Sequence, residues 1–596
     1  MENIYKSTIR EFQAKQLFFL IATDYIIINF LISLGSSSIA SIMDNIFLCV
    51  ALLGFIVFAT FTLWLLISCH LKKNNLPQIY SLIVLSPITL LLFYASDSQF
   101  PLLIPILIVS LTMICFFLVL IKKNIIMPEP KIGILIAAIL YFLVFAYLAI
   151  RQYNNFAVFN PQDYSNYNQI FWNTIRGNIF RSSLYGSNFT CHNSPFYFLL
   201  VPFYSIFPLP LTLMILKTLL LSLCVIPIYL IAKPMLPKTS LLPISLIFLF
   251  YPYLVSQNLN PPHEICYAPF FLLFTYYFFK TKRFYPFIIA LILSISIKEH
   301  IALVAIMFGV FALFRKRGPK WFITPIILGV AWAIFSLILI DRFKEMYQMK
   351  DTSTWLLLNM KQRFLYQGEG NIVSFISNGL AQSNICKIYS LKIASLLLLP
   401  LGMLLPLLSP VGLLGLPELI LNLLADSPAV FSPSRHYNII VSCFLIIATI
   451  ESIQKISSFS MAKKLRIKTE KFTLIIVIFI FSLTLIHAYS WLWLTSCPNS
   501  YIYVSTMKEA ISIIPKKAHV MIPSNIAVHV SSRKKYSIIG VQRYSNAKED
   551  PIADYVLIDK NTIYIKAYLK DIYSSIFNKN GIEILKKDIG ENNSRM

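Results

Sequence analysis

Apolar runs of about 20 residues recur along most of this chain, and a run of that length can cross a bilayer as a helix. Short basic clusters separate them, such as Lys72-Lys73, Lys122-Lys123 and Arg315-Lys316-Arg317. Hydrophobic residues make up 57% of the 596 positions, and charged residues make up 13%, compared with about 25% in soluble domains. The pattern predicts an all-α polytopic membrane protein with its bases on the cytoplasmic side.

The formal net charge of +25 does not indicate a nucleic-acid partner, because the bases lie in clusters between apolar runs. Such placement is typical of membrane topology and of attraction to anionic lipid. The nine cysteines are scattered, mostly inside apolar runs, and form no CxxC pair. We therefore expect neither a disulfide framework nor a zinc site.

Counting the runs predicts about fifteen spans and three parts of the chain. These are an N-terminal transmembrane extension of about four helices at 1–130, a transmembrane core at 131–495 and a soluble α/β module at 501–596. The positive-inside rule predicts a cytoplasmic N-terminus and an extracytoplasmic C-terminal module, in a multi-pass protein of the cytoplasmic membrane. The segment 195–208 is too short to span and is rich in aromatic residues and proline, which favours an interfacial helix.

Polar clusters interrupt the apolar pattern at five places that the predicted topology puts on one membrane face. Ionisable residues cost free energy in lipid unless they are paired or functional, so these clusters are the candidate site. The sharpest is Lys298-Glu299-His300, which stands inside an apolar stretch. The full candidate set is Asp163, His192, His263, Glu264, Lys298, Glu299, His300, Arg435 and His436.

The residue types suggest group transfer from a lipid phosphate. Asp163 can act as a general base on a hydroxyl, and Lys298, Arg435 or His263 can neutralise a phosphate leaving group. Glu264 and Glu299 can orient those bases or bind a divalent cation with Asp163, so a divalent cation is the one cofactor considered.

Structural explanations stand beside these roles. Asp163 also suits a helix cap or a turn, and His192 suits the cap of the interfacial helix. His263-Glu264 after two prolines also suits a helix start, and Arg435-His436 also suits an anchor at the membrane interface.

Several ordered motifs resemble those of an uncharacterised prokaryotic family of predicted membrane proteins, a domain of unknown function. QDYSNYNQIFWN resembles its F-D-L-G-x-F-D-Q-x-x-W-N signature, which adds Gln169 to the candidate substrate-binding residues. CHNSP is similar to its H-F-S-P, NPPHEICYAP to its F-H-P-E-x-x-x-P, and IKEHIAL to its K-E-D-x-A-L. The resemblance covers roughly residues 140–560, and the first four expected helices lie outside it.

That family in turn resembles the C-type (GT-C) glycosyltransferase superfamily, whose multi-spanning enzymes take sugars from polyprenyl-phosphate donors. The resemblance implies that Asp163 is the catalytic base and that PFYFLLVPFY is an interfacial helix. Two positions depart from the family pattern, because Asn168 and His300 each stand where the motifs have Asp. Asn168 cannot act as a base.

The expected function is therefore transfer of a sugar from a polyprenyl-phosphate donor to an extracytoplasmic acceptor, with membrane lipid as the other partner. The sequence identifies neither sugar nor acceptor. Two alternatives remain open at this point: a transporter or flippase for a lipid-linked or anionic solute, and a non-catalytic scaffold on a degenerate GT-C fold. Lys298-Glu299-His300 would serve as an ion relay in the first, and Asn168 and His300 motivate the second.

Overall fold

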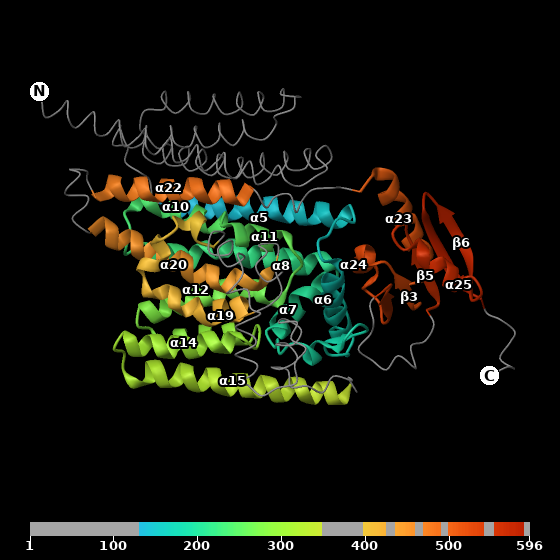
Figure 1. The fold of residues 1–596 in the computed structure, drawn as a ribbon, viewed down its shortest axis with the longest axis horizontal. Helices are drawn as coiled ribbons and strands as arrows, with labels where there is room; N and C mark the ends of the chain where they lie inside the picture. The colour runs from blue at the N-terminus through green and yellow to red at the C-terminus, as the bar shows by residue number, and fades with distance from the viewer. Residues whose placement is uncertain are drawn as a thin grey trace, which may run out of the picture.

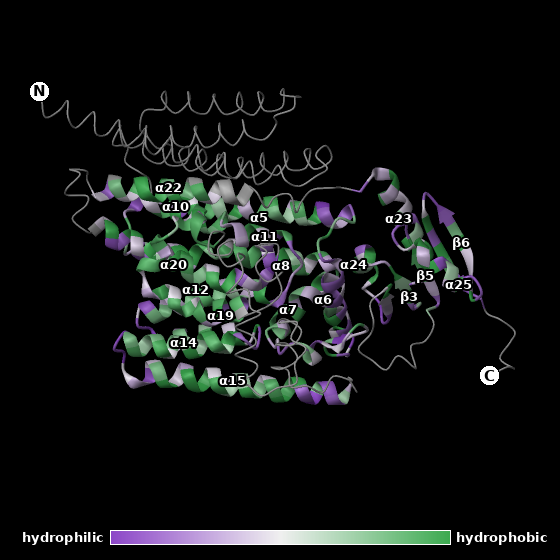
Figure 2. Ribbon diagram, in the orientation of Figure 1, coloured by the Kyte–Doolittle hydropathy of each residue, from purple (hydrophilic) through white to green (hydrophobic). Residues whose placement is uncertain are grey.

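The computed structural model describes residues 130–347, 397–424, 435–458, 469–489, 499–540 and 553–588, and all structural statements below concern these residues. The described part is mostly helical. Its long helices run nearly parallel to one another, and a small β-containing module lies at one end of them (Figure 1). Apolar residues dominate the lengths of these helices, and polar residues gather at their ends and in the module (Figure 2).

Within the described residues, four helical segments are long and apolar enough to cross a membrane, and a bent pair would make a fifth. The four are Pro130–Asn154 (α5), Pro210–Ala232 (α8, Pro210–Leu223, with α9, Val225–Ala232), Pro319–Met346 (α15) and His436–Ser457 (most of α20, Ile439–Ser458). The bent pair is α10, Lys238–Leu249, with α11, Pro252–Leu259, which meet at 48°. All five match apolar runs that the sequence predicts to span.

Most other predicted spans are shorter helices or irregular turns. The shorter helices are α12 (Ala268–Lys280), α13 (Phe284–Ile295), α14 (Ile301–Phe314) and α19 (Leu416–Leu424), whereas α22 (Thr469–Tyr489), in the last predicted span, has 21 residues. The described part of the run 393–408 forms the 3₁₀ turns Leu399–Leu401 and Leu405–Leu408, and the run 410–424 begins with a third at Pro410–Gly415. Proline begins or lies inside each turn and cannot donate the helical hydrogen bond. The predicted total of about fifteen spans stays a prediction, because its first four helices fall outside the described residues.

Glycines allow the hairpin of α14 and α15 to pack closely. A Cβ at Gly329 would lie 2.6 Å from the carbonyl oxygen of Ala302, and one at Gly309 would lie 2.5 Å from Cγ1 of Ile326. Small residues at helix crossings let backbones approach each other in membranes. The turn that precedes α14 carries Lys298, Glu299 and His300.

The stretch between α5 and α8 forms helix α6 (Pro161–Thr174), a two-stranded ribbon of β1 (Arg181–Ser182) and β2 (Gly186–Ser187), and helix α7 (Tyr197–Ile206). Asn160 precedes α6 with φ of 46°, and Pro161 supplies the fixed φ of a first helical residue. Asp163 lies in the first turn of α6, where the helix dipole favours a negative charge. Helix α7 buries Tyr197, Leu200 and Tyr204 and exposes most of its other apolar side chains.

The C-terminal module is a five-stranded sheet in the order β4-β3-β5-β7-β6. Its strands are β3 (Val520–Ile522), β4 (Tyr536–Ile538), β5 (Tyr555–Ile558), β6 (Tyr573–Lys579) and β7 (Ile582–Lys587), and its helices are α23 (Tyr501–Ile513), α24 (Ala527–Val530) and α25 (Lys566–Leu569). β3, β4 and β5 are parallel, whereas β7 and β6 continue the sheet antiparallel. The first three strands lie where the sequence predicts them. The sequence did not predict β6, which is mostly exposed, or β7, whose first four residues are buried.

Helix α6 holds this module through hydrogen bonds from three of its residues. Asn168 donates to the hydroxyls of Ser531 (2.8 Å) and Ser532 (3.0 Å). Gln169 donates to two main-chain carbonyls, those of Arg533 (3.0 Å) and Lys534 (3.3 Å). The same helix also meets the start of β4, because the Tyr536 hydroxyl donates to Oγ of Ser165 over 2.8 Å. The loop 531–536 and the first turns of α6 therefore form one polar interface.

Substitution of Asn168 by leucine should loosen this interface. It removes the donor to Ser531 and Ser532 and the carbonyl that accepts from Tyr204, and it leaves buried hydroxyls without these partners. We expect a loss of about 2 to 4 kcal/mol in the free energy of unfolding, and faster proteolysis of the module. Thermal unfolding in detergent measures the first effect. Asn178→Leu, at an exposed site after the same helix, is the control, and equal stability of the two variants would contradict the interface.

Candidate functional site

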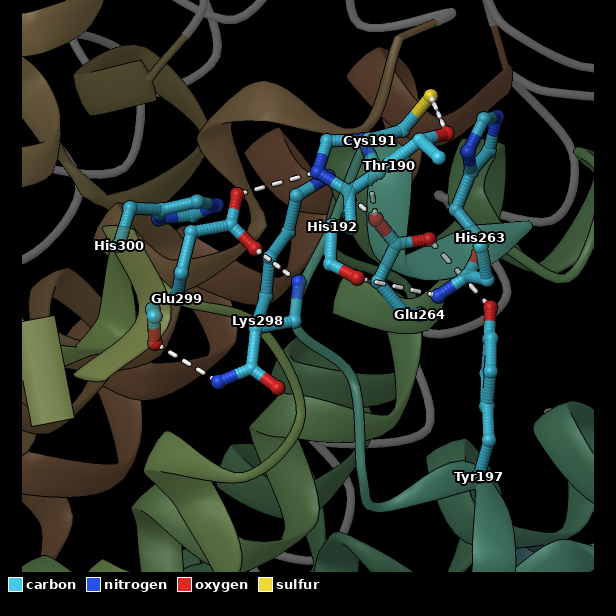
Figure 3. A network of polar contacts seen from close by, with 12 residues as sticks. Thr190, Cys191, His192, Tyr197, His263, Glu264, Lys298, Glu299 and His300 are labelled. Atoms are coloured by element: carbon cyan, nitrogen blue, oxygen red, sulfur yellow. Dashed lines mark hydrogen bonds and ion pairs between the residues drawn. The ribbon is translucent and has the colours of Figure 1, made fainter. Parts of the chain in front are cut away.

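Most of the ionisable residues singled out from the sequence lie together in one network of polar contacts, which contains His192, His263, Glu264, Lys298, Glu299 and His300 (Figure 3). Asp163 comes from α6, His192 from the segment before α7, and His263 and Glu264 from the turn between α11 and α12. The turn between α13 and α14 brings Lys298, Glu299 and His300, and the start of α20 brings Arg435 and His436.

Asp163 faces His263, and the other ring nitrogen of His263 is hydrogen-bonded to Tyr167. Nε2 of His263 lies 3.7 Å from Oδ2 of Asp163, and Nδ1 lies 2.8 Å from the hydroxyl of Tyr167. Because a carboxylate faces Nε2, the tautomer with its proton on Nε2 is favoured, and Tyr167 then donates to Nδ1. The side chain of Asp163 is 37% exposed, while that of His263 is buried. The acid is thus open to a ligand on one side and backed by a fixed imidazole on the other.

The imidazole of His263 is neutral at physiological pH. Burial lowers its pKa to about 4; Asp163 and Glu264 oppose this shift, and the positive charges of Lys298 and Lys217 add to it. A neutral ring with Nε2–H toward Asp163 can orient the carboxylate without taking its proton-accepting role.

A buried ion pair joins the turn between α11 and α12 to the turn between α13 and α14. Nζ of Lys298 lies 2.5 Å from Oε1 of Glu264, and their side chains are 3% and 1% exposed. The hydroxyl of Tyr197, on the inner face of α7, also donates to Oε2 of Glu264 over 3.4 Å (Figure 3). Burial opposes the ionisation of Glu264, but the charges of Lys298 and His192 outweigh it and hold the pKa of this carboxyl well below its usual range.

His192 lies between the two glutamates. Its Nδ1 is 3.1 Å from Oε1 of Glu299, and its Nε2 is 3.7 Å from Oε1 of Glu264. The main-chain N–H of Asn193 donates to Oε2 of Glu299 over 3.1 Å, and the side chain of Asn193 donates to Ser336 on α15. Burial opposes ionisation of Glu299, but His192 and Lys298 hold its pKa at about 2. These contacts tie the segment before α7 to the turn before α14.

His300 points to a different partner from its two neighbours. Its Nδ1 lies 2.9 Å from Oε2 of Glu418 on α19, and both side chains are buried. The three consecutive residues Lys298, Glu299 and His300 therefore reach three different segments of the chain. The sequence motif puts Asp at the position of His300, and the pair with Glu418 gives the histidine a structural partner.

The start of α20 closes the site above His263. The rings of His263 and His436 lie 4.1 Å apart between centroids, and the main-chain carbonyl of Arg435 accepts from the amide of Gln257. The guanidinium carbon of Arg435 lies 6.0 Å from the ring of Phe159, and no described carboxylate is within ion-pair distance of it. Arg435 is therefore a half-buried cation beside Phe159, and the next residue, His436, stacks on His263.

Asn168 and Gln169 lie on the part of α6 that faces the module. The amide of Gln169 is fully buried and also accepts from the main chain and hydroxyl of Ser183, so all its polar atoms are engaged within the chain. Asn168 is likewise buried between the two serines and Tyr204. Its departure from the family motif thus falls at a docking position rather than beside Asp163.

In the described ranges, no three His, Cys, Asp or Glu side chains are grouped so as to hold a metal ion. The divalent cation considered from the sequence remains without a described ligand set. Glu264 and Glu299 are instead occupied by Lys298 and His192.

Sequence reasoning missed four residues of the site: Tyr167, Tyr197, Asn193 and Lys217. The two tyrosines carry no signal in an aromatic-rich chain, in which 14% of residues are Phe, Trp or Tyr. Lys217 did carry one, because it is the sole Lys, Arg, Asp, Glu or His between Pro210 and Ala232.

Replacing Glu264 by glutamine should destabilise the protein strongly, because Lys298 would keep a buried charge without its counter-ion. We expect a loss of about 3 to 5 kcal/mol in the free energy of unfolding. The matched control is Glu509→Gln, which breaks the half-exposed 2.8 Å pair with Lys579. That variant should lose less than about 1 kcal/mol. Similar losses in both variants would show that the Glu264 pair is not the buried link described above.

His263 should make stability depend on pH on the acid side. The unfolded chain takes up a proton at this residue below about pH 6.5, whereas the folded chain does so only near its pKa of about 4. The contribution of His263 to the free energy of unfolding is therefore complete above pH 6.5. It falls by about 3 kcal/mol at most as the pH decreases toward 4. Chemical unfolding measured at several pH values tests this. His263→Asn should flatten that part of the profile, and an unchanged profile would contradict the assignment.

The solved structures that are similar to this chain include three that each cover 76% of its length. ArnT from Cupriavidus metallidurans bound to undecaprenyl phosphate is 9% identical, is covered over 98% of its own chain and has a TM-score of 0.47. The oligosaccharyltransferase of Archaeoglobus fulgidus tethered with an acceptor peptide is 11% identical, with 74% covered and a TM-score of 0.36. The archaeal oligosaccharyltransferase AglB of the same organism, with an inhibitory peptide and a dolichol-phosphate, is 11% identical, with 75% covered and a TM-score of 0.35. TM-scores below 0.5 do not establish a shared fold.

No curated protein matches the chain. A family model does match, over residues 158–583, which is more than half of the sequence and contains every candidate residue described above. Its description is a predicted membrane protein, in agreement with the spans and with the motifs that begin at α6. The chain belongs to this family of predicted membrane proteins, DUF2079.

Proposed function

We propose that this protein is a membrane glycosyltransferase that transfers a sugar from a polyprenyl-phosphate donor to a hydroxyl acceptor, with Asp163 as general base. One observation carries the proposal: Asp163 is 37% exposed, whereas Glu264 and Glu299 are 1% and 2% exposed and are held by other groups. Of these three acids, Asp163 alone can be reached by an acceptor. The donor class comes from the motif resemblance to GT-C enzymes.

In the proposed reaction, Asp163 acts as the general base. The carboxylate of Asp163 takes the proton of the acceptor hydroxyl, the oxygen bonds to the anomeric carbon, and the bond from that carbon to the phosphate breaks. The lipid phosphate leaves with the electron pair, and attack from the opposite side inverts the anomeric centre. Nε2–H of His263 holds the carboxylate in place during this step.

The leaving phosphate needs a cation, and Arg435 is the residue we assign to it. Its guanidinium is half-buried beside Phe159 and offers the planar donor pair that suits phosphate. Lys298 was a second candidate from the sequence, but its ammonium is buried against Glu264. We assign Lys298 to fixing that carboxylate and, through it, the turn that carries His263.

The lipid part of the donor fits beside helix α7. Phe198, Leu199, Phe203 and Ile206 on its outer face are exposed, while Tyr197 and Tyr204 on its inner face bond to Glu264 and Asn168. A short helix with an exposed apolar face suits the boundary between headgroups and acyl chains. α7 therefore links a lipid-facing surface to the residues around Asp163.

Asp163→Asn should block turnover and leave donor binding intact, since asparagine keeps the size and removes the base. Native mass spectrometry of gently extracted protein should show a polyprenyl-phosphate sugar that is enriched in this variant over wild type. Asp571→Asn, at an exposed acid of the module, is the matched control and should resemble wild type. If neither wild type nor Asp163→Asn carries such a lipid, the proposed function is wrong.

A transporter is the second candidate, favoured by two groups of ionisable contacts near the site: His192 with Glu264 and Glu299, and the buried pair of His300 with Glu418. Such contacts could carry protons between states. The two functions separate at Asp163. A transporter keeps the uptake of its solute in Asp163→Asn and accumulates no lipid-linked sugar.

A further inference from the structure

Lys217 is a buried cation inside an apolar span. It lies in the middle of α8, its side chain has no exposed surface, and no other Lys, Arg, Asp, Glu or His lies between Pro210 and Ala232. A charge at this depth costs free energy unless polar groups replace water around it. The partners of Lys217 therefore indicate why it is there.

Those partners are main-chain carbonyls at the end of α11. Nζ of Lys217 donates to the carbonyl oxygens of Gln257 (3.0 Å), Asn258 (2.9 Å) and Asn260, and it contacts Sδ of Met214 at 3.5 Å. The last carbonyls of a helix lack partners within the helix and carry the negative end of its dipole. The ammonium has three protons for three carbonyls, so it caps α11 from a neighbouring helix.

The capped carbonyls lie directly before the site. Two prolines separate Asn260 from His263 and Glu264, and the main-chain N–H of His263 bonds back to the carbonyl of Pro261 over 2.8 Å. Proline fixes φ, so this connection has little freedom. The position of Asn260 therefore determines the position of the His263 imidazole, which faces Asp163.

We propose that Lys217 is a positioning residue for the acid and histidine pair, because its ammonium fixes the end of α11 and thereby the turn that carries His263 and Glu264. Its charge also acts on the ring through space. The groups around His263 are Asp163 and Tyr167 from α6, Glu264 beside it, Lys298 from the turn before α14, His436 from the start of α20, and Lys217 from α8. Lys217 and Lys298 disfavour a second proton on the imidazole and so preserve its orienting role.

The inference rests on the proposed function only in naming Asp163 a base. Its test reads His263 directly and needs no substrate, so it can fail while the glycosyltransferase proposal stands, and the lipid experiment can fail while this one succeeds.

The test is a ¹⁵N NMR titration of the full chain with labelled histidine in nanodiscs, from pH 7 to 2.5, with the His263 signals assigned by their loss in His263→Gln. Lys217→Met removes the charge and the hydrogen bonds at similar side-chain length. We expect the midpoint of His263 to rise by roughly 0.5 to 1 pH unit, because a positive charge has been removed. We also expect its neutral ring signals at pH 7 to broaden, because the turn is no longer held.

Thr218→Val is the matched control. It removes the neighbouring hydrogen bond from Oγ1 of Thr218 to Oδ1 of Asn258 (2.8 Å), with no change of charge, and the midpoint should stay at the wild-type value. The proposal is overturned if Lys217→Met leaves the midpoint unchanged, or if Thr218→Val moves it as far.

Lys217→Arg decides the case in which Lys217→Met does not fold, since it keeps the cation. A wild-type midpoint in this variant supports the proposal, and a midpoint raised by the amount predicted for the neutral variant overturns it.

Discussion

The buried pair of Lys298 and Glu264 is the interaction on which the polar centre of this protein depends. Both side chains are at most 3% exposed, and the two residues lie in separate turns, 34 positions apart in the sequence. Neither charge is tolerable alone in this setting, so each turn is held in place by the other. His192, Tyr197 and Glu299 then attach to this pair, and the loop before α7 follows.

Around that pair, some charged side chains of the site are buried in ion pairs, and others are partly exposed to a ligand. Glu264, Glu299 and Glu418 are each matched to a basic partner, and their role is to hold loops at fixed places. Asp163 is partly exposed and forms no ion pair with a described Lys or Arg, and Arg435 is half-buried and forms none with a described carboxylate. A transfer reaction needs one group that accepts a proton and one that receives negative charge, while everything behind them stays still.

The sequence predicted much of this arrangement, for reasons that are physical. Polar residues such as Lys298 and His263 in apolar surroundings stand out, and the positions of α5, α8, α15 and α20 follow from apolar length alone. The sequence did not predict the short 3₁₀ turns around Pro400 and Pro406, because hydropathy does not register the missing amide hydrogen bond. Tyr167 was also missed, since its role depends on meeting His263, 96 residues later. The attachment of Asn168 and Gln169 to loop 531–536 joins positions more than 360 residues apart, and periodicity carries no information at that range.

That attachment has a consequence for how the protein is made. Helix α6 carries the acid Asp163 and is synthesised early, but its partners Ser531 and Ser532 emerge more than 360 residues later. At about 5 to 20 residues per second, the ribosome needs roughly 20 to 70 seconds to add the intervening chain. During this time α6 lacks its hydrogen bonds to Ser531 and Ser532, and a chain truncated before the module would lack them permanently. Helix α6 therefore gains its full set of hydrogen bonds only after the C-terminal module has been synthesised.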